Sequence, residues 1–250
     1  MKELMFFDCD CQIGNTLSGP KPGVEELLAE MDRSGIDQAL VRNGNFGPVG
    51  AVKANEETAQ MLRKDLSGRL YGVWGILPVQ CDEQPAGDVF FSAMKQNRIK
   101  ALTLDPAAHR FEACRITIGK LLDEAAERRI PVLLYPMQNN WKNVYDFMER
   151  FPDQLCIAGG GHKWGNDRYI RPLLENYPNL YISTAGYWVP EGLGDLVKIY
   201  GADRLLYGSG FPDYDQGSGM LQLKYAGLND SEIAQIAGEN LKSLLEGVLL

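Results

Sequence analysis

Residues 100–158 read KALTLDPAAHRFEACRITIGKLLDEAAERRIPVLLYPMQNNWKNVYDFMERFPDQLCIA. Short apolar runs at 100–104, 131–135 and 154–158 predict buried strands, and the segments 115–129 and 141–150 between them have the apolar spacing expected of helices. Strands that alternate with helices in this way are typical of parallel β-α-β units. The stretch therefore predicts an α/β protein.

The same alternation continues in both directions along the chain. Five further apolar runs flank this stretch, at 4–9, 38–42, 70–77, 180–184 and 204–207. Further helices are predicted over residues 22–33, 51–66, 88–97, 167–176 and 190–200, and Asp230 is expected to cap a last one. Eight strand-helix units predict a (β/α)8 TIM barrel, as one domain over residues 1–250. An open doubly wound sheet is the alternative, but it usually has a glycine-rich turn after its first strand, and this chain has none there.

The amino-acid composition argues against nucleic acids and membranes as partners. The net charge is -8, and nucleic-acid binders usually carry a basic face, so we expect no nucleic acid. No apolar run reaches the roughly 20 residues that span a bilayer, and the first residues have no signal-like core, so we expect no membrane and a cytoplasmic location. The five cysteines have irregular spacing and form no C-x-x-C, which predicts neither a disulfide framework nor a zinc ribbon.

Polar residues stand where the first strand ends, and chemistry in a barrel is located at the C-terminal ends of its strands. Because side chains alternate along a strand, Asp8, Asp10 and Gln12 are predicted to share one face, with Cys9 and Cys11 on the other. Asp8 is interpreted as a structural hydrogen-bond acceptor and the cysteines as packing residues. A carboxylate at Asp10 that faces the barrel interior needs a partner or a chemical role.

Three other strand ends carry candidate residues, each with a structural alternative. Asp105 precedes Pro106 and could bind a ligand or only start a loop. Tyr135 is expected to point its phenol at the barrel mouth, before a loop rich in amides. Glycines at 159–161 precede a histidine and a lysine, so their N–H groups could bind an anion or simply form a tight turn. The candidate catalytic residues are Asp10, Tyr135 and His162, and the candidate ligand-binding residues are Gln12, Asp105, Asn139, Gly160, Lys163 and Trp164.

Several segments together resemble a known family. Residues 7–14, FDCDCQIG, are similar to a first strand of pattern D-x-H-x-H-x-G, and residues 35–41, GIDQALV, to a G-I-D-x-A-V-V motif. Residues 177–184, YPNLYIST, resemble Y-P-N-V-Y-V-D-T, and residues 203–212, DRLLYGSGFP, resemble D-R-L-L-F-G-S-D-F-P. These motifs resemble the amidohydrolase superfamily, in the "amidohydrolase 2" branch of TIM-barrel metal-dependent hydrolases and decarboxylases.

The resemblance implies a metal site that this sequence does not reproduce. The family holds one or two divalent ions with two histidines on strand 1, one histidine on each of strands 5 and 6, and an aspartate on strand 8 that also acts as the base. The matching positions here are Asp10, Gln12, Tyr135, Gly159 and Gly210. We therefore expect no metal and no other cofactor at these positions, since activation of water by a Lewis acid needs an ion with an open coordination position.

Three functional hypotheses follow. The first is a non-catalytic barrel that binds a small polar or anionic molecule, or that pairs with an active relative or forms a homo-oligomer. The second is a metal-independent lactone or ester hydrolase or decarboxylase, with Asp10 as acid or base, Tyr135 as donor to an oxyanion, and His162 with Lys163 holding an anion. The third is a metal-dependent hydrolase with an unusual site.

Overall fold

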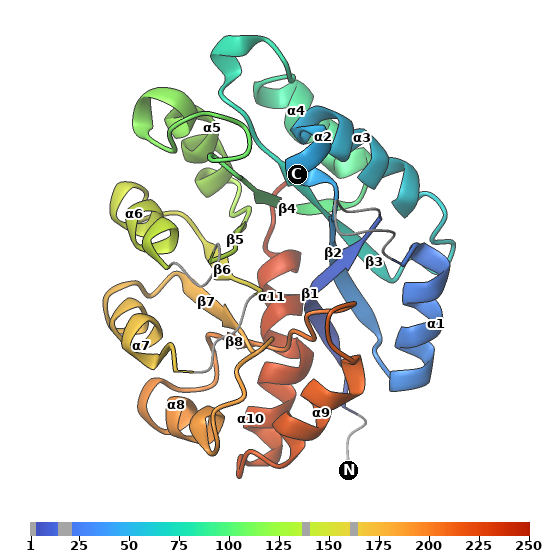
Figure 1. The fold of residues 1–250 in the computed structure, drawn as a ribbon, viewed down its shortest axis with the longest axis vertical. Coiled ribbons are helices and arrows are strands. Elements are labelled where there is room, and N and C mark those ends of the chain that lie inside the picture. Colours follow the sequence, from blue (N-terminus) through green and yellow to red (C-terminus); the bar gives the residue numbers. More distant parts are fainter. Residues whose placement is uncertain (1–3, 15–21, 137–140, 161–164) are drawn as a thin grey trace.

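The computed structural model describes residues 4–14, 22–136, 141–160 and 165–250. Eight parallel strands form one sheet whose spatial order follows the chain, so each strand pairs with the next (Figure 1). The strands are β1 Phe7–Ile13, β2 Gln38–Asn43, β3 Leu70–Gly75, β4 Ile99–Thr103, β5 Val132–Leu134, β6 Cys156–Ala158, β7 Leu180–Ser183 and β8 Leu205–Leu206. This arrangement confirms the predicted (β/α)8 TIM barrel.

The barrel is closed by backbone hydrogen bonds between β1 and the segment that follows β8. The Cys9 N–H donates to the Tyr207 carbonyl at 2.9 Å, and the Gln12 N–H donates to the Phe211 carbonyl at 2.8 Å. In the opposite direction the Gly210 N–H donates to the Asp10 carbonyl at 3.1 Å. The two segments that contain Asp10 and Gly210 are therefore held side by side.

Helices surround the strands, as Figure 1 shows. They are α1 Val24–Ser34, α2 Phe46–Val49, α3 Ala51–Leu62, α4 Gly87–Gln96, α5 Arg115–Glu127, α6 Lys142–Arg150, α7 Asp167–Asn176, α8 Gly192–Tyr200, α9 Gln216–Lys224, α10 Asp230–Ala234 and α11 Asn240–Glu246, with a 3-10 turn η1 Val79–Cys81 and a π-helical turn η2 Gln235–Glu239. The helices α2 and α9 were not predicted. No helix in the described part of the chain is both long and apolar enough to cross a membrane.

The last predicted helix corresponds to α10, η2 and α11, and its first residue, Asp230, is one residue earlier than predicted. Its cap is Asn229, whose side-chain oxygen accepts hydrogen bonds from the N–H groups of Ser231 and Glu232, both at 3.0 Å. The Glu232 carboxylate accepts the Asn229 N–H in return at 2.9 Å. The prediction that Asp230 is the cap is wrong because this reciprocal pair places Asp230 inside the first turn.

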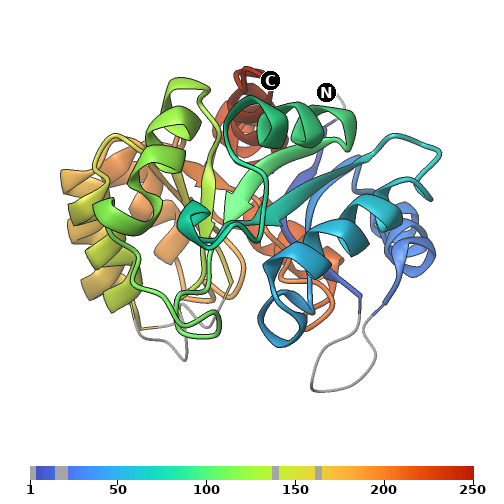
Figure 2. The same cartoon turned by 90° about the horizontal axis from the view of Figure 1, so that it is seen from above.

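The barrel interior is filled by one cluster of apolar side chains from successive strands. Leu40, Val73, Ala101, Leu133 and Ile157 belong to it. Leu241, Leu244 and Leu245 of α11 belong to the same cluster. The helix α11 lies at the end of the barrel where the strands begin (Figure 2). Because α11 covers that end, the opposite end, where the strands finish, is the end available for a site.

The first strand departs from simple alternation. Its register with β2 shifts between Asp8 and Cys11, which marks a β-bulge. As a result Cys9 packs in the interior cluster, whereas Cys11 lies near Asp8 and contacts Gln216 of α9. The predicted faces of β1 are therefore wrong for Asp8 and Cys9, because a bulge changes the direction in which the following side chains point. The same shift turns Asp10 to the barrel mouth.

Candidate functional site

The barrel mouth is lined by side chains that stand one layer above the interior cluster. Along a strand the residue two positions on faces the same side, so Arg42 follows Leu40 and Tyr135 follows Leu133. Ser183, at the end of β7, completes this layer beside Asp10. Polar groups from β1, β2, β5 and β7 thus meet at the C-terminal ends of the strands, where barrel sites form.

Asp10 is a buried carboxylate with two donors to one of its oxygens. Its relative exposure is 4%, and its Oδ2 accepts hydrogen bonds from the Gly160 N–H and, at 3.2 Å, from the Ser183 hydroxyl. Its backbone N–H donates to Asp8 Oδ1 at 3.0 Å. These contacts join the ends of β1, β6 and β7, and they hold the carboxylate in one orientation.

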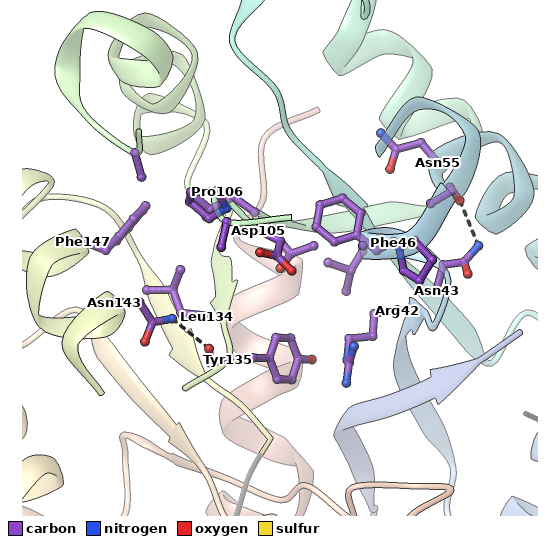
Figure 3. A pocket seen from close by; sticks show the side chains of 18 of the residues that line it. Arg42, Asn43, Phe46, Asn55, Asp105, Pro106, Leu134, Tyr135, Asn143 and Phe147 are labelled. Atoms are coloured by element: carbon purple, nitrogen blue, oxygen red, sulfur yellow. Dashed lines mark hydrogen bonds between the residues drawn. The ribbon is translucent and has the colours of Figure 1, made fainter. Parts of the chain in front are cut away.

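Arg42 and Tyr135 form a stacked pair across the mouth. The Arg42 guanidinium lies over the Tyr135 ring, 4.1 Å from its centre, and Nη2 donates to Gln12 Oε1 at 3.2 Å. In Figure 3 the phenol of Tyr135 points toward Arg42. The ring face attracts the cation, so the pair fixes a positive charge at this point of the barrel.

Two buried polar atoms of this pair lack partners. Arg42 Nε and Tyr135 Oη are buried, and neither has a hydrogen-bond partner among the described residues. Burial raises the pKa of Tyr135 well above its usual value, and the negative charge of Asp10 raises it further, although Arg42 opposes the shift. Tyr135 therefore stays protonated over the physiological pH range and can donate a hydrogen bond.

Two cavities meet at Arg42. The larger has a volume of about 440 Å³ and contains Tyr135, Asp105 and Asn143 in its wall. The smaller, of about 250 Å³, is lined by Asp10, Gln12, Gly160 and Gly210, among others. Arg42 lines both cavities and Tyr135 lines the larger one, so the stacked pair stands at the boundary between them.

Most of the predicted site residues that the structure describes lie at these cavities. Asp10, Gln12 and Gly160 line the smaller one, and Asp105 and Tyr135 line the larger one. The candidates outside the described residues are Asn139, His162, Lys163 and Trp164. The other histidine, His109, is not part of either cavity wall, and its Nε2 hydrogen-bonds the Phe46 carbonyl at 2.9 Å.

Arg42 is not among the site residues predicted from the sequence. A signal was available, because Arg42 ends the predicted strand at 38–42 and period-2 alternation places it on the same side as the buried Leu40. A charged residue at that position of a barrel strand points toward the mouth. Ser183 carried the same signal, since it stands near the end of the predicted strand at 180–184.

A (β/α)8 barrel with polar side chains at its C-terminal mouth defines a class with many activities. The family model described as Amidohydrolase matches residues 12–244, which is most of the chain. The chain belongs to the amidohydrolase family. No curated protein sequence matches it significantly.

Several solved structures share the fold. A putative amidohydrolase from Staphylococcus aureus has a TM-score of 0.74 at 18% identity, over 97% of this chain and 100% of that one. A dihydroxybenzoic acid decarboxylase from Polaromonas sp. JS666, with bound manganese and the inhibitor 2-nitroresorcinol, has a TM-score of 0.73 at 14% identity, over 97% of each chain. A probable 2-pyrone-4,6-dicarboxylic acid hydrolase from Acinetobacter baumannii, with citric acid bound, has a TM-score of 0.71 at 13% identity, over 96% of this chain and 99% of that one. At these identities the likeness shows the barrel fold.

The described residues at the family's metal-ligand positions do not fit a divalent ion. The Asp10 oxygen that faces Gly160 already has two donors, and the Gln12 amide oxygen already accepts from a guanidinium. Gly159 and Gly210 have no side chain to offer. Within the parts of the chain that the structure covers, no group of three or more His, Cys, Asp or Glu side chains could hold a metal. The Arg42 guanidinium is the cation that this part of the barrel itself supplies.

Proposed function

We propose that the barrel mouth binds a small anionic organic molecule, and that this protein is a ligand-binding barrel of the amidohydrolase family. The observation that carries the proposal is the cavity of about 440 Å³ whose wall contains both Arg42 and Tyr135. This volume lies within the usual range of small-molecule sites. Apolar side chains such as Phe46, Leu134 and Phe147 line the rest of the cavity, as such sites require.

The Arg42 guanidinium in the cavity wall supports an anion rather than a neutral molecule. A carboxylate suits it, because an arginine and a carboxylate form strong charge-assisted hydrogen bonds. Two of the similar barrels are named for carboxylic acids, and one holds citric acid.

Calorimetric titration with benzoate and with n-alkanoates from propionate to hexanoate tests the proposal. We expect at least one of these acids to bind with one-to-one stoichiometry, and Arg42→Gln to weaken it by about tenfold or more, because a charged hydrogen bond is removed. The matched control is Arg63→Gln, at the C-terminal end of α3, where an exposed guanidinium donates to Asn97. Absence of binding by every acid, or equal binding by the Arg42 variant, would contradict the proposal.

A second candidate, a metal-independent hydrolase or decarboxylase, is favoured by how closely Asp10 and Tyr135 approach one another. A side chain placed on Gly159 would stand 3.3 Å from Asp10 Oδ2 and 2.9 Å from Tyr135 Cε1. A protonated phenol beside a carboxylate can donate to a developing oxyanion while the carboxylate accepts a proton. The role predicted for His162 in this scheme lies outside the described residues.

Turnover of phenyl esters and γ-lactones in the presence of a chelator tests the second candidate. If it holds, Tyr135→Phe is expected to lower kcat by roughly 10²–10³-fold, as loss of one oxyanion donor does. Asp10→Asn is expected to lower the same rate. Equal rates for the wild-type chain and both variants would show that the turnover does not come from this site.

A further inference from the structure

The larger cavity contains two opposite charges without counter-ions. Arg42 lies on β2, and Asp105 lies two residues after the end of β4; both side chains line the cavity. Arg42 donates to Gln12, and Asp105 Oδ1 accepts the Ala108 N–H at 3.0 Å. Neither side chain forms an ion pair with any other residue that the structure describes. In Figure 3 the Asp105 carboxylate lies apart from Arg42 and Tyr135, beside Pro106.

The other charged residues of the cavity wall are paired or exposed. Asp146 forms an ion pair with Lys142 at 2.5 Å. Arg150 and Glu112 are exposed, so water screens their charges. Arg42 and Asp105 are half-buried and therefore act most strongly on a molecule inside the cavity.

Apolar side chains line the cavity together with these two charges. Phe46, Leu134 and Phe147 line the same space and offer contact to a hydrocarbon stem. A monoanion would compensate Arg42 but leave Asp105 without a cation. A ligand with an anionic and a cationic group would form an ion pair with Arg42 and another with Asp105. Each ion pair is stronger where water is excluded.

We infer that the ligand is zwitterionic, with an anionic group at Arg42, a cationic group such as an ammonium at Asp105, and an apolar stem between them. This inference rests on the proposed function, because it places the ligand in the same cavity. It adds a second specificity-determining residue, Asp105, and assigns that residue to the end of the ligand opposite the anion.

Matched pairs of acids test the inference. The probes are 4-aminobutyrate, 5-aminopentanoate and 6-aminohexanoate, each compared by calorimetry with the n-alkanoate of the same chain length. The three lengths sample different spacings between the two charges. We expect at least one amino acid of the series to bind about tenfold or more tightly than its matched alkanoate, because it adds one charged hydrogen bond.

Two variants assign the effect to a residue. Asp105→Asn keeps an oxygen for the Ala108 N–H and removes the charge, so it should abolish the advantage of the amino compound. Alkanoate binding should not weaken, because a negative charge is removed from the cavity wall. Glu112→Gln, in the rim of the same cavity, is the matched control and should keep the advantage.

The outcomes separate the two proposals. Alkanoates that bind through Arg42, with amino compounds that bind no better, would overturn the zwitterionic ligand and leave the proposed function intact. An advantage that survives in Asp105→Asn, or that disappears in Glu112→Gln, would also overturn it. Absence of binding by both series would contradict the proposed function itself.

Discussion

At the residue scale, the position of Tyr135 depends on two adjacent glycines. A Cβ on Gly159 would stand 2.9 Å from Tyr135 Cε1, and a Cβ on Gly160 would stand 2.5 Å from Cδ1. Gly160 also has a φ of +56°, a conformation that favours glycine. The ring of Tyr135 therefore occupies space that any larger residue at these positions would need, and Gly160 supplies the N–H that holds Asp10.

Substitution of Gly160 measures how tightly the Tyr135 ring packs against the backbone at Gly160. Gly160→Ala combines an unfavourable φ with a clash against Tyr135, whereas Gly35→Ala has a similar φ of +81° and no atom within 4 Å. The Gly160 variant should therefore lose about 1–3 kcal/mol more of its free energy of unfolding than the Gly35 variant, as overpacked sites do. Urea denaturation of both variants checks this. Equal losses would mean that Tyr135 moves aside without cost.

Sequence reasoning reached some of these residues and missed others for a physical reason. Asp10, Tyr135 and Asp105 were found because polar residues at barrel strand ends need an explanation. Arg42 was missed because an arginine at a strand end is usually solvated. Alternation placed it on the side of Leu40, but its stack on Tyr135 is visible only in the structure. Contacts between β2 and β5 are not readable from either strand alone.

At the element scale, the turn between α3 and β3 depends on Asp65. Its Oδ1 accepts the N–H groups of Ser67 and Gly68 at 3.0 and 3.2 Å, and its Oδ2 accepts the Leu70 N–H at 2.9 Å. Arg98 forms an ion pair with the same side chain at 3.0 Å. Burial alone would raise the pKa of Asp65, but these hydrogen bonds and the Arg98 charge outweigh it and lower the pKa.

Asp65→Asn tests the contribution of this turn. At pH 7 we expect the variant to lose about 3 kcal/mol of its free energy of unfolding, because Arg98 is left without its counter-charge. A lowered folded-state pKa means that the stabilisation is present above the ordinary value of 3.8 and is lost as the pH falls through the folded-state pKa. The difference between the variant and the wild-type chain should therefore shrink below pH 3.8.

The control for Asp65 is an exposed ion pair. Asp88 bonds to Arg128 at 2.7 Å, but its side chain is 91% exposed. Asp88→Asn should change the free energy of unfolding by no more than about 0.5 kcal/mol. Denaturant unfolding at several pH values measures both variants, and a pH-independent loss in Asp65→Asn would contradict the ionic explanation.

The elements themselves were largely predictable, and the departures have identifiable causes. Every predicted strand and helix overlaps one in the structure. The helix α9 was missed because its residues, 216–224, include two glycines and have no clear apolar face. The bulge in β1 was missed because alternation assumes a constant register, and a bulge gives no local signal in this sequence.

At the scale of the whole molecule, the helix that closes the barrel and the cavities that we propose bind a ligand lie at opposite ends. One end is closed by α11, and the other carries the cavities that meet at Arg42. The family's scaffold is kept, while the positions that would hold its metal carry other side chains or none. The single domain, the homo-oligomer and the pairing with an active relative remain predictions.

Elemental analysis tests whether the protein binds a divalent metal ion. We expect protein purified without chelator to contain far less than one zinc or manganese ion per chain. At the ligand positions the Asp10 and Gln12 oxygens already accept hydrogen bonds, Tyr135 offers a protonated phenol, and Gly159 and Gly210 have no side chain. Addition of either ion should leave the Tm unchanged, since only an ion that binds the folded state raises it. A stoichiometric ion whose removal lowers the Tm would contradict this prediction.

The titration of the wild-type chain and Arg42→Gln with benzoate and the n-alkanoates, in the presence of a chelator, tests whether the Arg42 guanidinium holds the anion without a metal ion. We expect one-to-one binding by the wild-type chain that the chelator does not affect, and affinity that falls by about tenfold or more in the variant. Binding that requires an added divalent ion, or that does not change without the Arg42 guanidinium, would contradict this expectation.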